Sequence, residues 1–399
     1  MTKTTRILFL ISRFLDGGID TVLVEYLRFL SANSNYRITL GICVSMDELE
    51  VYRHLIPDSV ELHHFVKAKW LTKWRQRKIK SGVPTAIKIY DEVILAPIRR
   101  CVIAKEIKNL SRCHDVVIDF DCCSYSFLKN ISIPKIAWYH FSFEETLKQN
   151  SRRTRRIGRM MEHYDKVVVI SEHMRQEGAK AFPKIADKLK VIYNAKECNH
   201  LMQKAEEDVA DEIICQPYIL AVERLVESQK DITTLLRAYS ILRKDYHHEE
   251  LLILLGKGSS ETLLRQTAKD LGIAGNVHFI GFRNNPYPWM KRAKLLVHSA
   301  KFEGLPTVLI EGLMLDKLMV SSDCPTGPRE ILDNGRAGLL VPVADAQAMA
   351  EAINKILTDN SLQNQIKDGI KKHRYLFTFE HTKQMFDQMI NEVIIKQIL

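Results

Sequence analysis

The stretch RILFLISRFLDGGIDTVLVEYLRFL, residues 6–30, decides how the chain begins to fold. Its first part, RILFLIS (6–12), has the length and apolar composition of a strand that is buried on both faces. Asp16, Gly17 and Gly18 then allow a turn, and the apolar residues of TVLVEYLRFL recur with the period of a helix. A strand, a glycine turn and a helix in this order predict the opening unit of a doubly wound α/β domain.

The same alternation continues along the chain. Short apolar runs follow at YRITLGICV (36–44), VELHHF (60–65), DVVIDF (115–120), KIAWYH (135–140), KVVVIS (166–171) and KLKVIYN (188–194). The pattern pauses over 195–217, and resumes at YILAVE (218–223), LLILLG (251–256), NVHFIG (276–281), LLVHSA (295–300), LMVSS (318–322) and GLLVPV (338–343). The expected fold is therefore α/β, with two doubly wound, Rossmann-like domains in tandem.

The pause marks the domain boundary, because a charged segment such as AEEDVADE is typical of a linker. We expect an N-terminal Rossmann-like domain at 1–196, a linker at 197–217, a C-terminal Rossmann-like domain at 218–375 and closing helices at 376–399. The last segment has helical period, and no strand signal follows it.

Composition limits the class of protein. The 399 residues are 46% apolar, enough for two cores, and no apolar run approaches the roughly 20 residues that span a bilayer. The eight cysteines form no C-x-x-C pair and the N-terminus shows no cleavable signal, so we expect reduced thiols in the cytoplasm and no metal ribbon. The net charge of +10 indicates an anionic partner: nucleic acid, acidic lipid or a phosphorylated substrate.

The positions just past each strand carry the chemistry, because parallel sheets bind ligands at the carboxyl ends of their strands. FEGLPTVLIEGL (302–313) follows LLVHSA and holds two glutamates eight positions apart. Gly304 allows a tight turn, and the N–H groups present within residues 305–308, where Pro306 has none, can bind a phosphate. Glu303 precedes the helix that follows and Glu311 lies inside it, and both carboxylates suit the hydroxyl groups of a sugar-like ligand.

Three further loops add cations, a glycine turn and a candidate site for a base. Arg224 and Lys230 follow YILAVE, and two cations at a strand end can pair with a diphosphate. Gly256-Lys257-Gly258 follows LLILLG, and the loop that begins with Phe282 follows NVHFIG and can hold a flat base. DCPTGPREIL (323–332) follows LMVSS. Each motif alone also fits an ordinary surface loop.

Together these motifs resemble those of a family 4 glycosyltransferase, a retaining enzyme of the GT-B fold, of the type that assembles bacterial surface glycans. The matching features are the E-x7-E pair around Gly-Leu-Pro, the Arg224 and Lys230 pair, and the N-terminal Gly-Gly loop. The resemblance is strongest over residues 218–350. It implies GT-B architecture, with two Rossmann-like domains facing a central cleft, the donor in the C-terminal domain and the acceptor against the N-terminal one.

The resemblance also implies roles for single residues. Arg224 and Lys230 would bind the diphosphate of a nucleotide sugar, Glu303 the transferred sugar, and Glu311 the ribose. The implied donor-binding residues are Gly17, Gly18, Arg224, Lys230, Phe282, Glu303, Gly304, Leu305, Pro306, Thr307, Val308 and Glu311.

In the N-terminal domain, Gly17 and Gly18 resemble the loop that closes over the donor phosphates. Asp20 stands where similar enzymes more often have a glutamate. His140, at the end of KIAWYH, corresponds to a histidine that similar enzymes place near the sugar. The implied catalytic residues are Glu303, His140, Arg224 and Lys230.

The resemblance implies a nucleotide-sugar donor, with a UDP-linked hexose or N-acetylhexosamine as the first choice, and a glycan or lipid-linked glycan as acceptor. The pathway would be the synthesis of lipopolysaccharide, capsule or oligosaccharide. Transfer retains the anomeric configuration. No metal or other cofactor is expected, because Arg224, Lys230 and helix N-termini can neutralise the diphosphate.

Two basic segments of the N-terminal domain, AKWLTKWRQRKIKSG (68–82) and NSRRTRRIGR (150–159), suit an anionic membrane surface, since the first interleaves cations with tryptophans. We therefore expect a cytoplasmic protein that lies peripherally on the inner face of the cytoplasmic membrane. The same features can bind RNA, but no RNA-binding motif accompanies them, so no nucleic-acid partner is expected. A plain solvated helix face stays open as well.

Two other functions fit the same pattern of residues. A nucleotide-sugar epimerase of the same fold would release UDP without an acceptor, whereas the E-x7-E and Gly-Leu-Pro arrangement favours transfer. A non-catalytic protein that binds membrane or RNA would not need Arg224, Lys230, Glu303 and Glu311, all of which are present.

Overall fold

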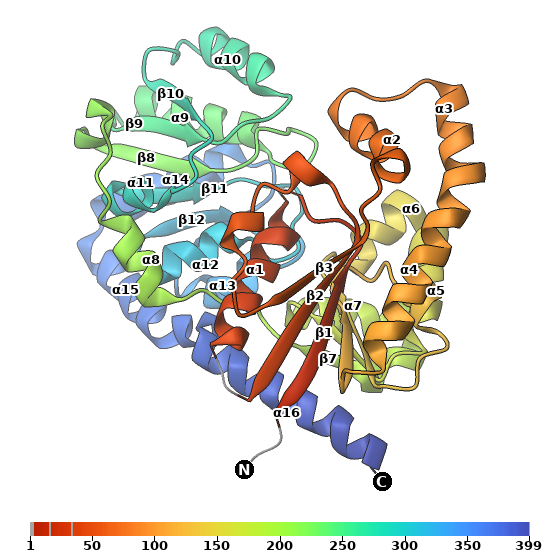
Figure 1. Cartoon of the computed structure of the whole chain (residues 1–399). Coiled ribbons are helices and arrows are strands. Elements are labelled where there is room, and N and C mark those ends of the chain that lie inside the picture. Colours follow the sequence, from red (N-terminus) through yellow and green to blue (C-terminus); the bar gives the residue numbers. More distant parts are fainter. Residues whose placement is uncertain (1–3, 16, 33–34, 399) are drawn as a thin grey trace. The chain divides into compact units, whose positions relative to one another are not determined.

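The computed structural model describes residues 4–15, 17–32 and 35–398, so Asp16 of the expected glycine turn lies outside the described residues. The chain forms two compact units, each with its own parallel sheet (Figure 1). The first unit comprises Met1–Ile170, Arg175–Ile192 and Lys383–Leu399, and the second comprises Ser171–Met174 and Tyr193–Thr382.

The sheet of the first unit has the strand order β3-β2-β1-β4-β5-β6-β7. Its strands are β1 (Thr5–Ile11), β2 (Tyr36–Val44), β3 (Glu61–Val66), β4 (Val116–Asp119), β5 (Lys135–Tyr139), β6 (Lys166–Val169) and β7 (Leu189–Val191). β1 pairs with β2 from Thr5 beside Tyr36 to Ile11 beside Ile42. The side chains from Ile7 to Leu10 are fully buried, as the apolar run predicts for a central strand.

Helices connect these strands. They are α1 (Gly18–Ser31), α2 (Lys69–Lys80), α3 (Thr85–Tyr90), α4 (Ala96–Ser111), α5 (Tyr125–Leu128), α6 (Phe143–Met161) and α7 (Glu172–Ala181). A π-helical turn, η3 (Asp91–Leu95), joins α3 to α4, and shorter 3-10 turns lie at η1 (Asp47–Leu49), η2 (Arg53–Leu55) and η4 (Pro183–Lys188).

The sheet of the second unit has the order β10-β9-β8-β11-β12-β13. Its strands are β8 (Tyr218–Val222), β9 (Leu251–Leu255), β10 (Val277–Gly281), β11 (Leu295–His298), β12 (Met319–Ser322) and β13 (Leu339–Val341). The helices are α8 (Cys198–Ala205), α9 (Ile232–Asp245), α10 (Glu261–Asp270), α11 (Tyr287–Arg292), α12 (Thr307–Met314), α13 (Pro328–Ile331), α14 (Ala346–Thr358) and α15 (Asn360–His373), with 3-10 turns η5 (Glu212–Cys215), η6 (Asp333–Gly335) and η7 (Arg374–Phe377). The last helix, α16 (Phe379–Ile398), begins in the second unit and belongs to the first unit from Lys383 onward.

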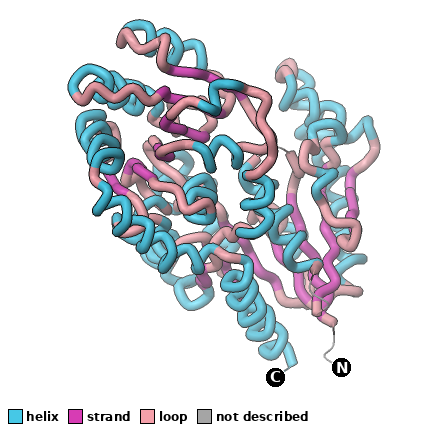
Figure 2. Tube along the Cα trace, turned by 90° about the vertical axis from the view of Figure 1, so that its left-hand side faces the viewer, coloured by secondary structure: helices cyan, strands magenta, loops and turns pink. Residues whose placement is uncertain are grey.

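Both sheets reverse their strand order at one point: between β1 and β4 in the first, and between β8 and β11 in the second. Figure 2 shows the strands of each unit as an inner layer with helices around them. The expected α/β class with two doubly wound domains is confirmed. In such sheets ligands bind at the reversal point, in a crevice at the carboxyl ends of the strands.

The unit limits differ in detail from the expected segments. The change of unit falls at Tyr193, and the expected linker carries α8 and η5 within the second unit. From Lys383 onward α16 belongs to the first unit, where the Tyr36 hydroxyl donates to Asp387 at 2.5 Å and Lys166 pairs with Glu392 at 2.7 Å. Helical period predicts that α16 exists, but period alone does not say which sheet it covers.

Candidate active site

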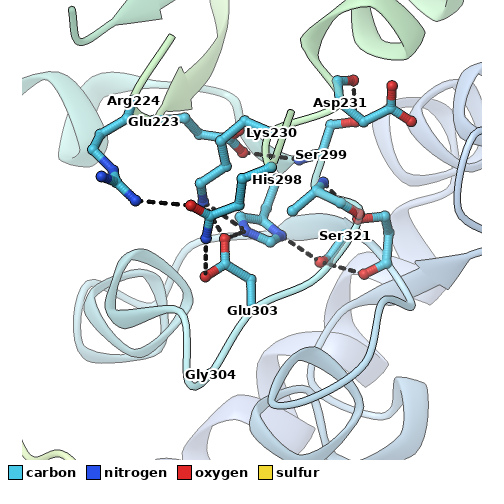
Figure 3. Close-up of polar contacts among 12 residues, drawn as sticks. Glu223, Arg224, Lys230, Asp231, His298, Ser299, Glu303, Gly304 and Ser321 are labelled. Atoms are coloured by element: carbon cyan, nitrogen blue, oxygen red, sulfur yellow. Dashed lines mark hydrogen bonds and ion pairs between the residues drawn. The ribbon is translucent and has the colours of Figure 1, made fainter. Parts of the chain in front are cut away.

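The candidate site lies at the reversal point of the second sheet, where β8 and β11 are neighbours. Glu223 follows β8, His298 ends β11, and Glu303 stands in the loop between β11 and α12. Lys230 comes from the loop before α9. Figure 3 shows that these four side chains, which belong to separate strand ends and loops, converge on one point.

Lys230 and Glu303 form a buried ion pair at the centre of this group, with each side chain 10% exposed. Nε2 of His298 lies 3.4 Å from Lys230 Nζ and 3.5 Å from Glu303 Oε1. Burial alone would raise the pKa of Glu303, but the charge of Lys230 and the contact with His298 outweigh burial and lower that pKa to about 2. Glu303 is therefore a charged hydrogen-bond acceptor at neutral pH.

Glu223 is a second buried carboxylate beside Lys230. Its Oε1 accepts a hydrogen bond from the Ser299 N–H at 2.8 Å, whereas its buried Oε2 has no hydrogen-bond partner among the described residues. Burial raises the pKa of Glu223. Burial would lower the pKa of Lys230, but the charges of Glu223 and Glu303 outweigh burial and raise it. Lys230 is thus an ammonium ion facing two carboxyl groups.

His298 connects this group to the end of β12. The Ser321 hydroxyl donates to the Ser322 carbonyl at 3.0 Å, so it accepts from the Nδ1–H of His298 at 2.9 Å (Figure 3). Nε2 of the same ring lies between the Lys230 ammonium and the Glu303 carboxylate. The histidine therefore fixes the position of Lys230 from the sheet side.

Arg224 reaches the same group through Gln229. The guanidinium donates to Gln229 Oε1 at 2.8 Å, and Gln229 Nε2 donates to Glu303 Oε2 at 3.5 Å. Arg224 itself is exposed, so its guanidinium can bind an anion that enters the site.

The loop from Glu303 to Val308 is held by the segment after β12. The Glu303 N–H donates to the Pro325 carbonyl at 2.8 Å, and the Thr326 hydroxyl donates to the Gly304 carbonyl at 2.8 Å. Gly327 adopts φ +93°, and a Cβ there would lie 2.6 Å from Pro306 Cδ, so only glycine fits. The contacts fix the approach to α12, whose first turn (Thr307, Val308) presents N–H groups without partners inside the helix.

Glu311, one turn into α12, is buried and pairs with Lys196 at 3.0 Å. The sequence predicts that this carboxylate needs a polar partner. Lys196, which lies between β7 and α8, is that partner, and the motif around Glu311 gives no sign of it.

Phe282 follows β10 and is half-exposed, with Lys257 Nζ 5.0 Å above its ring. The Gly256–Gly258 turn is packed against backbone, because a Cβ at Gly256 would lie 1.8 Å from the Glu223 carbonyl oxygen. These glycines therefore allow the loop after β9 to approach the backbone of the loop after β8, which begins with Glu223.

The remaining predicted residues lie in the first unit. Gly17 caps α1, and its N–H donates to the Asp20 carboxylate at 2.9 Å, so Asp20 helps to close the start of that helix. Gly18 begins α1. His140 follows β5, donates from Nε2 to the Phe120 carbonyl at 2.8 Å, and is buried, which lowers its pKa to about 4. It is a neutral imidazole at pH 7.

The structure thus brings Arg224, Lys230 and Glu303 together beside the Gly304–Val308 loop. Three residues of the same group were missed from sequence: Glu223, Gln229 and His298. Glu223 and His298 each stand at the end of a buried apolar strand. A polar side chain at such a position is unusual, and this could have indicated a site. Gln229 gave no signal.

In the part of the chain that the structure describes, no group of three or more His, Cys, Asp or Glu side chains is arranged to hold a metal ion. None of the described helices has both the length and the apolar composition needed to cross a membrane.

Comparison with known proteins bears on the same half of the chain. Residues 205–373 match the family model "Glycosyl transferases group 1". The chain is 33% identical over 190 residues, 48% of its length and 50% of the relative's, to the N-acetylgalactosamine-N,N'-diacetylbacillosaminyl-diphospho-undecaprenol 4-alpha-N-acetylgalactosaminyltransferase of Campylobacter jejuni. It is 32% identical over 152 residues, 38% of its length and 43% of the relative's, to the lipopolysaccharide core biosynthesis glycosyltransferase LpsE of Rhizobium meliloti. The chain spans about half the length of the curated relatives it matches.

Solved structures extend the likeness to the whole fold. HepE of Anabaena, crystallised with UDP and glucose, superposes with a TM-score of 0.73 at 17% identity, over 97% of this chain and 100% of that one. The lipopolysaccharide outer core galactosyltransferase WaaB gives 0.67 at 18% identity, over 98% and 100%. The expected resemblance to group 1 glycosyltransferases is confirmed for residues 205–373, and the fold is that of GT-B glycosyltransferases.

Proposed function

We propose that the protein is a retaining glycosyltransferase that moves a hexose or N-acetylhexosamine from a UDP-linked donor to a glycan or lipid-linked glycan in bacterial surface-glycan assembly. The observation that carries this proposal is the buried Lys230–Glu303 pair with Arg224 beside it, at the reversal point of the second sheet. The relatives' names, which include glycosyltransferases for diphospho-undecaprenol-linked and lipopolysaccharide glycans, support it.

The cations of the site suit a nucleotide diphosphate. Lys230 is held by Glu303 and His298, so its ammonium is in place before a donor arrives. Arg224, exposed at the same point, adds a planar set of donors for a second phosphate oxygen. Two preorganised cations stabilise the negative charge that develops as the sugar–phosphate bond breaks.

The carboxylates suit the hydroxyl groups of the donor. Glu303 stays ionised because of its lowered pKa, so it can accept hydrogen bonds from the transferred sugar. Glu311, held by Lys196, would accept hydrogen bonds from the ribose. Its pairing with Lys196 removes the cost of leaving a buried carboxylate unpaired before the nucleotide binds.

Transfer then proceeds on one face of the sugar. The bond from the anomeric carbon to the diphosphate oxygen breaks, and the acceptor oxygen forms its bond from the same side. The acceptor proton passes to the departing diphosphate. Lys230 and Arg224 hold that leaving group, and no residue has to form a covalent intermediate. Lys230 and Arg224 supply the charge that a metal ion would otherwise supply.

The first unit offers a surface for a membrane-bound acceptor. On α3, η3 and α4, five apolar side chains are 40% or more exposed: Ile89, Tyr90, Val93, Ile94 and Ile98. Arg99, on α4, pairs with Asp91 at 2.7 Å and donates to the Leu71 carbonyl of the basic helix α2 at 2.8 Å, which ties the apolar face to that helix. Exposed apolar residues beside lysines and arginines suit an anionic lipid surface.

A transfer assay tests the enzyme. Purified protein, UDP-hexoses or UDP-N-acetylhexosamines and a diphosphate-linked glycan should yield a new α- or β-linkage with the anomeric configuration of the donor, read by NMR. Glu303→Gln, which keeps the shape but not the charge, should lose the product. UDP release with wild-type protein but no new glycosidic bond would contradict transfer and favour an epimerase.

Vesicle pelleting tests the membrane surface separately. The Val93→Ser, Ile94→Ser double variant should bind phosphatidylglycerol vesicles at least about fivefold less than wild type, since two exposed apolar side chains are lost. Leu263→Ser, an equally exposed apolar position on α10, is the matched control and should bind as wild type does. Equal recovery from anionic and neutral vesicles would argue against an electrostatic membrane site.

A further inference from the structure

A surface cavity of about 500 Å³ lies in the first unit, outside the residues assigned above. Its lining includes Asp47 and Glu48, from the turn after β2, and four residues of α2: Lys69, Lys73, Gln76 and Lys80. These four are spaced at intervals of four, three and four along the helix, so they share one face of α2. We call this the lysine cavity.

The turn that forms one wall is held by buried groups. Glu50 accepts from the Met46 N–H at 2.8 Å, and its carboxylate contacts His64 Nε2 at 2.9 Å; both side chains are buried. Asp47 takes a positive φ of 48°, an uncommon conformation for a residue other than glycine. This turn is therefore fixed from the core side rather than by the cavity's contents.

The opposite wall is also anchored. Arg99 donates to the Leu71 carbonyl at 2.8 Å, and Arg75 pairs with the Asp91 carboxylate at 3.0 Å. Arg99 pairs with the same carboxylate, so Asp91 joins α2 to α4 through two arginines. The lysine-bearing face of α2 thus keeps its position relative to the turn.

The charges inside the cavity leave two cations available. Asp47 accepts from Gln76 Nε2 at 2.8 Å and from the Ser45 hydroxyl at 3.0 Å, and Glu48 pairs with Lys80 at 3.3 Å. Within the described residues, neither Lys69 nor Lys73 has a carboxylate partner. Two ammonium groups one helical turn apart match the spacing of a phosphate or diphosphate.

We propose that the lysine cavity is an anion subsite that binds the phosphate or diphosphate of the acceptor through Lys69 and Lys73; the choice of acceptor rests on the proposed glycosyl transfer. The cavity lies past the carboxyl ends of β2 and β3, the edge of the first sheet that also carries Gly17 and His140. An acceptor bound there by its phosphate is positioned by charge, while its glycan stays free for transfer.

Titration calorimetry with inorganic pyrophosphate tests the subsite. The full chain is first saturated with UDP, so that the donor site is occupied. Wild type should bind pyrophosphate saturably, and Lys69→Gln with Lys73→Gln should weaken it at least about tenfold, because both ammonium groups without a carboxylate partner are lost. The matched control, Arg77→Gln with Lys78→Gln, removes two exposed charges of the same helix outside the cavity and should stay within about twofold of wild type. Equal weakening of both doubles, or no weakening of the cavity double, overturns the proposal.

Two further arms separate the source of the phosphate and the enzyme's function. The cavity double should raise KM for a diphosphate-linked acceptor without changing UDP affinity, and should pellet with phosphatidylglycerol vesicles as the control double does. A selective loss of vesicle binding, with pyrophosphate affinity unchanged, would assign the lysines to a lipid headgroup and overturn the acceptor subsite. Absence of UDP binding in wild type would instead contradict the proposed transferase, and the pyrophosphate titration would then decide on the cavity by itself.

Discussion

The carboxyl edges of the two sheets hold their lysines in different ways. In the second unit, Lys230 is buried and lies beside the carboxyl groups of Glu223 and Glu303, whose charges raise its pKa. In the first unit, Lys69 and Lys73 are exposed on one helix face, and the lysine cavity around them is open. A buried cation must be held by counter-charges even without ligand, whereas exposed lysines stay hydrated until an anion arrives. We therefore expect the first arrangement to be the more selective for its anion.

Breaking the buried pair should have the largest effect. Lys230→Ala leaves Glu223 and Glu303 buried without their cation, which we expect to cost about 3 kcal/mol of unfolding free energy and to lower transfer at least about 100-fold. Chemical denaturation and initial rates measure the two effects.

The matched control for Lys230 is Lys257→Ala, a cation at the same edge of the sheet that contacts the Phe282 ring rather than a carboxylate. It should change stability by less than about 1 kcal/mol. A Lys230 variant as stable as this control would show that the buried pair does not hold the site together.

His140 gives the next largest effect, on stability against pH. Burial lowers the pKa of His140 to about 4 in the folded chain, whereas the pKa of an unfolded histidine is near 6.5. Between about pH 6.5 and about pH 4 the unfolded chain therefore binds more protons than the folded chain. Stability is therefore lost as pH falls through this window, by about 1.6 kcal/mol between about pH 6.5 and pH 5.

The check is to compare wild type with His140→Gln by denaturant unfolding across the same pH range. The variant should lose this part of the pH dependence. An unchanged slope would mean that His140 titrates normally and is not the buried neutral ring seen beside Phe120.

Arg224 should show a smaller loss that is confined to activity. Arg224→Ala should lower transfer more than about tenfold with the thermal unfolding temperature unchanged, because the guanidinium is exposed and its neutral partner Gln229 stays satisfied by water. Arg265→Ala, which removes an exposed arginine paired with Glu261 on α10, is the control for a general charge effect. Near-normal turnover of Arg224→Ala would remove Arg224 from the donor site.

The same contrast explains how much the sequence could predict. Apolar runs and glycine turns predict both sheets, because strand length and burial are local properties of a parallel sheet. Arg224, Lys230, Glu303 and the Gly304–Val308 loop could be named because they lie at strand ends in one order along the chain. In the structure the ion pair joins Lys230 to Glu303, and Gln229 bridges Arg224 to Glu303.

What the sequence could not predict depends on contacts between distant segments. Lys196 pairs with Glu311 across more than a hundred residues, and the last part of α16 packs on the first unit. The lysine cavity likewise needs the turn after β2 to face α2, and spacing along α2 shows only that its lysines share a face. In each case the sequence of one segment does not indicate which distant segment it contacts.

The smallest effect expected concerns Glu48, the one acid of the lysine cavity that pairs with a lysine. The Lys80–Glu48 pair spans 3.3 Å with both side chains largely exposed, so Glu48→Gln should change unfolding free energy by less than about 0.5 kcal/mol. It removes one negative charge and releases Lys80, so affinity for pyrophosphate should rise about two- to fivefold at low salt and less at high salt. Calorimetry at two ionic strengths measures this. Weaker binding than wild type would mean that Glu48 holds Lys80 in the binding geometry, and that the cavity is as preorganised as the buried pair.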